Sequence, residues 1–139
     1  MQEINFDEAV ELILTRDPRF SRDAYTFVRE ALDYTQKIIG KEARGAIRHV
    51  SGQELLEGIR KFALNQFGPM TTTVFEEWNI RHCRDFGEIV FNMVEIGLLA
   101  KTEKDTRDDF QNGYDFTEAF RKPFQPQGKS SSETKPAVG

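Results

Sequence analysis

The sequence has few of the residues that most often carry chemistry. Its 139 residues include one cysteine, Cys83, and two histidines, His49 and His82. A single cysteine cannot form an internal disulfide bond, which argues against a secreted disulfide framework. A zinc site built from these three residues would need a fourth ligand, and their spacing matches no common zinc motif. A glycine-rich phosphate-binding loop is also missing. We therefore expect no metal, no cofactor and no enzymatic activity.

Long apolar runs and a strong charge of one sign are missing as well. No apolar run approaches the roughly 20 residues that a membrane span needs, and the first residues lack the basic and apolar regions of a signal peptide. The 19 basic and 23 acidic residues give a net charge of −4. No segment is basic enough to be the usual footprint of a nucleic-acid-binding protein. These observations predict a cytoplasmic protein that does not bind membranes.

Aromatic residues, by contrast, are abundant. Twelve phenylalanines and an apolar content of 38% predict a packed core. A chain of this length usually forms one domain, which we expect to span residues 1–122, with an N-terminal helical part at 5–50 and a second part at 51–122. From 123 to 139 the chain is mostly Pro, Gln, Gly, Ser and Lys, a composition that predicts a disordered tail.

Helical periodicity and capping residues predict two helices in the N-terminal part. Asn5 can cap the first helix, with a glutamate three residues later as in a capping box. Pro18 marks a break, because proline disfavours helical geometry at the residue before it. Ser21 can cap a longer second helix, and Gly40 is a natural end for it.

Two capping boxes predict the first two helices of the second half. Ser51 and Glu54 fit one box, and the helix that they open should end at the Gly-Pro pair at 68–69. Thr73 and Glu76 fit another box and should open a short helix. Each box pairs the cap side chain with a backbone N–H of the first turn, which has no partner inside the helix.

The remaining elements give the second half a recognisable order. A third helix is expected over 85–96, and residues 98–101 and 113–116 look like two strands around a charged turn. This order, with joints at 67–75 and 94–99, resembles a winged helix-turn-helix domain. The resemblance implies a mainly α (α+β) fold in which two N-terminal helices pack on a winged-helix-like half with three helices and a β-hairpin. A helical bundle with a terminal hairpin is the alternative.

Several segments also carry a resemblance to a known family. They are Asp17-Pro-Arg-Phe, Ala24-Tyr-Thr-Phe-Val-Arg-Glu-Ala-Leu, Arg48-His-Val-Ser-Gly-Gln-Glu-Leu-Leu, Gln66-Phe-Gly and Asp85-Phe-Gly-Glu-Ile-Val-Phe. They are similar to a family of short uncharacterised proteins restricted largely to planctomycetes and verrucomicrobia. The similarity spans roughly residues 5–124. It implies a bacterial protein that folds as one domain, and it implies no activity.

Charge on the third predicted helix bears on DNA binding. A DNA-binding winged helix places this helix in the major groove and its basic side chains on phosphates. The helix should expose Asp85, Glu88, Asn92 and Glu95. Three carboxylates would oppose the attraction to phosphate that supplies most non-specific affinity. The basic side chains that can contact a nucleic acid or another partner are Arg81, His82, Arg84, Lys101, Lys104 and Arg107.

These observations favour a non-enzymatic protein-interaction or regulatory module. Its expected partner is another protein or a second copy of the chain, and a DNA-binding transcriptional regulator is the first alternative. A thiol-based sensor or enzyme is the second, because Cys83 lies near a predicted helix N-terminus beside basic residues, where a thiolate is stabilised. That alternative requires an exposed thiol. A cysteine packed as a small apolar group is the simpler interpretation.

Aromatic residues recur at helical spacing and indicate core rather than a ligand cage. They are Phe62, Phe67, Phe75, Trp78, Phe86 and Phe91. Phe91 falls outside the stripe formed by Phe86, Val90 and Met93. It should therefore face the first two helices or belong to an exposed partner surface.

Overall fold

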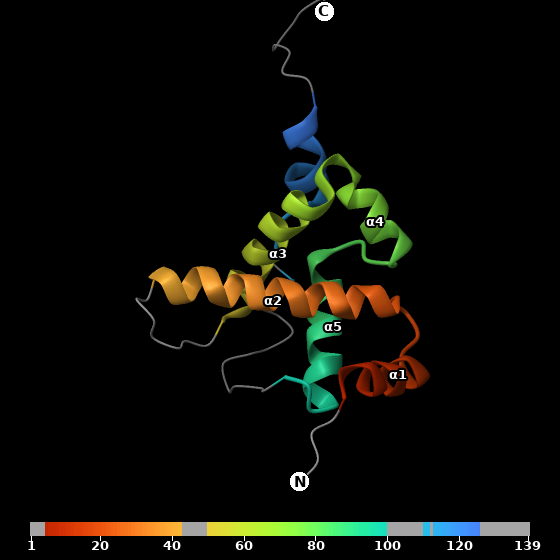
Figure 1. Cartoon of the computed structure of the whole chain (residues 1–139). Helices are drawn as coiled ribbons and strands as arrows, with labels where there is room; N and C mark the ends of the chain where they lie inside the picture. Colours follow the sequence, from red (N-terminus) through yellow and green to blue (C-terminus); the bar gives the residue numbers. More distant parts are fainter. Residues whose placement is uncertain (1–4, 43–49, 100–109, 112, 126–139) are drawn as a thin grey trace, which may run out of the picture.

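The computed structural model describes residues 5–42, 50–99, 110–111 and 113–125, and these residues are arranged as packed helices (Figure 1). The long elements are α1 (Phe6–Arg16), α2 (Arg22–Glu42), α3 (Gly52–Phe67), α4 (Thr71–Glu77) and α5 (Cys83–Glu95). The short ones are the 3-10 turns η1 (Gly68–Met70) and η4 (Lys122–Phe124) and the π-helical turn η3 (Thr117–Arg121). A mainly α fold is therefore confirmed, and within these described ranges no residue belongs to a strand.

Polar caps fix the starts of the first three helices close to the predicted places. The Asn5 side chain accepts hydrogen bonds from the first turn of α1, from Asp7 N at 2.8 Å and Glu8 N at 3.2 Å. At α3, Ser51 and Glu54 form the complete capping box that the sequence predicts. These bonds satisfy backbone N–H groups that a helix leaves without partners at its first turn.

The predicted capping box at Thr73 is wrong, because α4 begins at Thr71. The Thr71 hydroxyl is buried and donates to the Gly68 carbonyl oxygen at 2.7 Å. It therefore closes the turn between α3 and α4, where Gly68 has a positive φ of 52° that glycine adopts without a steric cost. Thr73, two residues further on, lies exposed inside the helix.

The predicted winged-helix half with its β-hairpin is wrong. Leu98 and Leu99 form a turn after α5 rather than a strand, and residues 113–115 form an irregular segment that leads into η3. That segment bonds to helices instead of to a partner strand. The Tyr114 hydroxyl donates to the Leu56 carbonyl of α3 at 2.7 Å, and the Cys83 thiol of α5 donates to the Tyr114 carbonyl at 3.4 Å. Of the expected charged turn at 102–112, residues 102–109 and 112 lie outside the described residues, as do residues 100 and 101 of the first expected strand.

Helix α5 lies at the centre of the fold instead of presenting a free recognition face. Figure 1 shows α2 crossing α5, with α1 beside the other end of α5. The expected exposure of Asp85, Glu88 and Asn92 is wrong, because all three are half-buried and only Glu95 is exposed. Contacts with the loop after α1 explain the difference for Glu88 and Asn92, whereas Asp85 accepts from the backbone N–H groups of Arg81 and His82.

A polar network joins α5 to the loop between α1 and α2. Asn92 Nδ2 lies 3.0 Å from both Asp17 Oδ2 and the hydroxyl of the buried Tyr25, and it donates to both. Arg19 donates to Asp17 at 2.7 Å and to Glu88 at 3.1 Å. The face of α5 that was predicted to be exposed to solvent is therefore hydrogen-bonded to the N-terminal part of the chain.

Aromatic side chains fill the interior, as their helical spacing predicted. Phe27 of α2 lies with its ring centroid 5.5 Å from those of Phe62, Phe67 and Trp78. The fully buried Phe75 packs edge-on against Phe86 at 5.4 Å. Offset and edge-to-face contacts of this kind add to the stabilisation that area burial supplies. The core therefore joins both halves of the chain into one cluster.

Two further predictions concern where the folded domain ends and whether a helix can span a membrane. Pro123 and Phe124 belong to η4, so helical structure continues past the predicted boundary at 122, and residues 126–139 lie outside the described part. Among the described helices, none combines the length and apolarity that crossing a bilayer requires.

Candidate functional site

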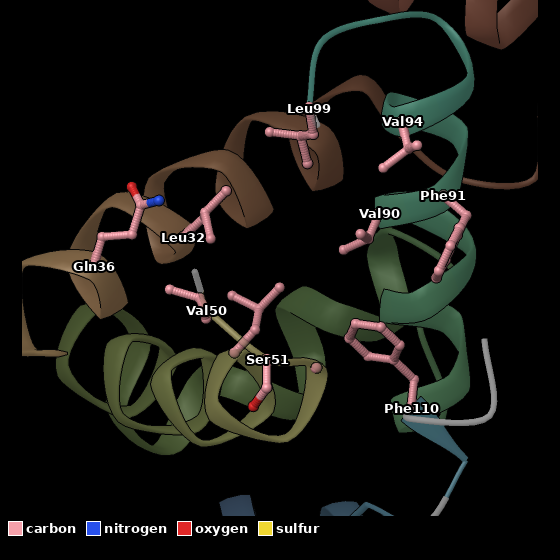
Figure 2. A pocket seen from close by; sticks show the side chains of 11 residues that line it. Leu32, Gln36, Val50, Ser51, Val90, Phe91, Val94, Leu99 and Phe110 are labelled. Atoms are coloured by element: carbon pink, nitrogen blue, oxygen red, sulfur yellow. The ribbon is translucent and has the colours of Figure 1, made fainter. Parts of the chain in front are cut away.

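An apolar pocket of about 160 Å³ opens between α2, the start of α3 and α5 (Figure 2). Most of its described lining side chains are aliphatic or aromatic, and none of these residues is titratable. The lining residues are Leu32, Gln36, Val50, Ser51, Gly52, Leu55, Val90, Phe91, Val94, Leu99 and Phe110. We refer to this site as the apolar pocket.

Side chains from α2 and α5 face each other across the pocket. Leu32 and Gln36 are one helical turn apart on α2, so they lie on the same face. Val90 and Val94 have the same spacing on α5, and Figure 2 shows them on the opposite side of the space from Leu32. Leu32, Val90 and Val94 are all half-buried. The pocket therefore exposes aliphatic surface that the core leaves incompletely covered.

Ser51 lines the pocket, yet its hydroxyl oxygen accepts a hydrogen bond from a backbone N–H group. Its oxygen accepts from Glu54 N at 3.1 Å, and Figure 2 shows the hydroxyl turned away from the pocket. An oxygen that already caps a helix is poorly placed to act as a nucleophile, which needs an adjacent base within hydrogen-bond reach. Gln36 is then the main polar side chain at the rim.

Phe91 and Phe110 form the aromatic end of the pocket. Their rings meet edge to face at 90° with centroids 6.4 Å apart, and both are buried. Phe110 also lies directly on Gly87 of α5, where an added Cβ would come within 2.8 Å of the Phe110 Cβ. Phe91 therefore belongs to the pocket wall. The sequence offered one signal for this, because Phe91 is apolar yet falls outside the stripe of Phe86, Val90 and Met93, and so widens the apolar arc of α5.

A second, polar hollow of about 490 Å³ lies at the start of α5. It brings together three of the basic residues that the sequence singled out, Arg81, His82 and Arg84, whose side chains are exposed. The rest of its lining comprises Cys83, Gln111, Gly113, Tyr114, Asp115, Phe116 and Thr117. The other predicted contact residues, Lys101, Lys104 and Arg107, lie outside the described part of the chain, as does His49. We refer to this second site as the basic hollow.

Cys83 is buried at the floor of the basic hollow. Only 4% of it is exposed, and its thiol donates to the Tyr114 carbonyl. Burial raises the pKa of the Cys83 thiol to about 11, because the interior disfavours the charged thiolate more than the neighbouring hydrogen bonds stabilise it. A thiol-based sensor or enzyme would need an exposed thiol that ionises easily. Cys83 in this fold is buried instead, and its pKa is raised.

Comparison with known proteins places no outside constraint on either site. No protein-family model, curated protein or solved structure matches this chain at a significant level. The resemblance to the planctomycete and verrucomicrobial family thus stays a prediction.

Proposed function

We propose that this chain is a non-enzymatic protein-interaction module whose apolar pocket receives an apolar side chain of a partner protein. The observation that carries the proposal is a pocket with aliphatic and aromatic walls from α2, α3 and α5, in which none of the described lining residues is titratable. Sites that bind apolar groups have this composition, with few polar groups at the rim.

The size of the apolar pocket suits a single anchoring side chain. An apolar cavity of about 150 Å³ can hold a molecule as large as benzene, and this pocket measures about 160 Å³. A leucine or phenylalanine side chain of a partner therefore fits. Burying such a side chain contributes about 1.5 to 3 kcal/mol, so one anchor supplies only part of a protein interface.

The pocket walls are held in place before any partner binds. The capping box at Ser51 fixes the start of α3, and the Phe91–Phe110 contact fixes the aromatic end. Side chains that are already ordered lose little conformational entropy on binding. Preorganisation of this kind favours a binding role for the pocket.

The position of α5 supports a protein partner in preference to DNA. Two of the side chains expected on a recognition face, Glu88 and Asn92, bond to Arg19 and Asp17 of the chain itself. A helix held in this way cannot enter a major groove without breaking those bonds.

Methyl NMR of the full chain tests the proposal with N-acetyl-L-phenylalanine amide as the probe. An anchor worth about 1.5 to 3 kcal/mol corresponds to a Kd between about 80 and 6 mM, so titrating the probe to about 50 mM occupies at least roughly a third of the pockets. We expect saturable shifts of the Val90 and Leu99 methyl resonances. A Val94→Phe variant, which fills the pocket, should lose these shifts.

A Leu12→Phe variant is the matched control, because Leu12 is 51% exposed on α1 and lies outside the pocket lining. It should bind the probe as the wild type does. The proposal fails if the Val90 and Leu99 methyls do not shift at 50 mM probe. It fails equally if Val94→Phe leaves their shifts unchanged while circular dichroism shows a folded variant.

A further inference from the structure

We propose that the basic hollow binds one anionic side chain of a partner protein, a carboxylate or a phosphate ester. This inference rests on the charges around the start of α5 and is independent of the apolar pocket. The hollow is lined by Arg81, His82 and Arg84, and among its described lining residues Asp115 is the one carboxylate.

Two carboxylates at the hollow, Asp85 and Asp115, already accept hydrogen bonds from backbone groups. Asp85 Oδ2 accepts from Arg81 N at 2.8 Å and from His82 N at 3.0 Å. Asp115 Oδ2 accepts from Glu118 N at 3.1 Å. Each carboxylate therefore caps a helical turn rather than pairing with a guanidinium of the hollow.

Arg81 and Arg84 accordingly have no ion pair with any described residue. Arg60, in contrast, pairs with Glu57 one turn away on α3. Two arginines that line one hollow create a local positive charge in a chain whose net charge is −4. The planar guanidinium offers paired donors that match a carboxylate or a phosphate.

Both walls of the hollow are tied to the core. Across its floor the Cys83 thiol bonds to the Tyr114 carbonyl, and the Tyr114 hydroxyl bonds to Leu56 of α3. Gly113 packs so closely on Cys83 that an added Cβ would lie 2.5 Å from its sulfur. The segment 113–116 is therefore held at a fixed position relative to the start of α5, and the hollow keeps its shape for a ligand.

The surroundings of the hollow favour one anionic side chain over a nucleic acid. A volume of about 490 Å³ leaves ample room for a phosphorylated or acidic side chain. Duplex DNA is bound through many phosphates along an extended basic surface. Asp85, Asp115 and Glu118 flank the hollow and would repel the neighbouring phosphates of a polyanion.

NMR of the arginine Nε–H groups in the full chain tests the inference with defined probes. N-acetyl-phosphoserine amide and N-acetyl-glutamate amide are titrated separately, and we expect saturable shifts of Arg81 and Arg84 with at least one of them. The probe with the lower Kd identifies the anionic group. Arg81→Gln and Arg84→Gln should each weaken its binding about two- to fivefold, the range expected for one exposed ion pair.

A Lys61→Gln variant is the matched control, since it removes one positive charge from the exposed surface of α3 outside the hollow. It should leave the Kd unchanged. The inference is overturned if neither probe shifts Arg81 and Arg84, or if Lys61→Gln weakens binding as much as the arginine variants. It is also overturned if duplex DNA binds with a multi-phosphate salt dependence that Arg81→Gln and Arg84→Gln abolish. These readouts do not involve the methyl groups of the apolar pocket, so the two proposals can fail separately.

Discussion

Replacing Gly58 with alanine tests how closely α2 and α3 pack. Gly58 is buried in the middle of α3, and a Cβ added there would lie 2.8 Å from the Cβ of Thr35 on α2 and closer still to its hydroxyl oxygen. Thr35 is only 4% exposed, and its hydroxyl donates to the Ala31 carbonyl at 2.7 Å. The crossing of α2 and α3 therefore leaves no space for a side chain at position 58.

Two opposing effects set the size of the expected change. In an open helix, glycine to alanine stabilises by about 1 kcal/mol. Here rotation of Thr35 moves its hydroxyl but not its Cβ, so the two helices must shift apart. Overpacking a core in this way costs typically 1 to 3 kcal/mol and occasionally more. We expect Gly58→Ala to lower the free energy of unfolding by about 2 kcal/mol, the opposite sign from helix propensity.

Urea unfolding followed by the fluorescence of the single tryptophan, Trp78, and by circular dichroism measures this change. Asn65→Ala, at an exposed position of α3, is the propensity control and should stabilise by a few tenths of a kcal/mol. Thr35→Ala combined with Gly58→Ala removes the hydroxyl contact. The double variant should show a coupling of about 1 kcal/mol or more, because the two sites touch. A Gly58→Ala variant as stable as the wild type would refute the close packing, as would a double variant with no coupling.

Three further predictions concern the thiol, acid stability and helix capping. At pH 8 a colorimetric disulfide reagent should react slowly with Cys83 in the folded chain and rapidly in urea, since its pKa is raised to about 11; equal rates would contradict its burial. The Arg19 hydrogen bonds hold the pKa of Asp17 well below its usual range, so the stability that they provide is present above pH 4 and is lost as pH falls. Asp17→Asn should therefore flatten the decline of stability between about pH 5 and 2, measured by urea unfolding; an unchanged slope would exclude this network as its source. Ser51→Ala should cost about 1 kcal/mol by the same assay, and a loss below about 0.3 kcal/mol would show that the cap contributes little.

Local chemistry in the sequence determined most of the helices and their core faces. Asn5 and Ser51 mark helix starts because their side chains satisfy the unpaired N–H groups of the next turn, an effect that needs only neighbouring residues. Aromatic residues such as Phe75 and Phe86 are buried as their spacing predicts. Burial at helical spacing follows from the 3.6-residue period, which is also local.

The clustering of Arg81, His82 and Arg84 was visible in the sequence because it is also a local property. Their closeness follows from their order in the chain, whereas the hollow that they share with Asp115 and Thr117 does not. The apolar pocket was not predicted, since its walls come from α2, α3 and α5. Helical spacing identifies which residues of each helix are apolar, and it does not show which of them a neighbouring helix leaves uncovered.

The conformation of the second half of the chain was determined by tertiary contacts and not by local sequence. Residues 113–116 have the composition of a strand, yet Tyr114 and Phe116 pack on helices, because α3 and α5 offer a carbonyl and aromatic rings where a hairpin would offer a partner strand. Asp85, Glu88 and Asn92 are polar, which indicates solvent in an isolated helix. They are half-buried here because backbone N–H groups and the loop after α1 supply their hydrogen bonds. Strand pairing and the burial of Glu88 and Asn92 depend on partners distant in the chain, and no local pattern specifies those partners. Asp85 differs, because it accepts from the neighbouring N–H groups of Arg81 and His82.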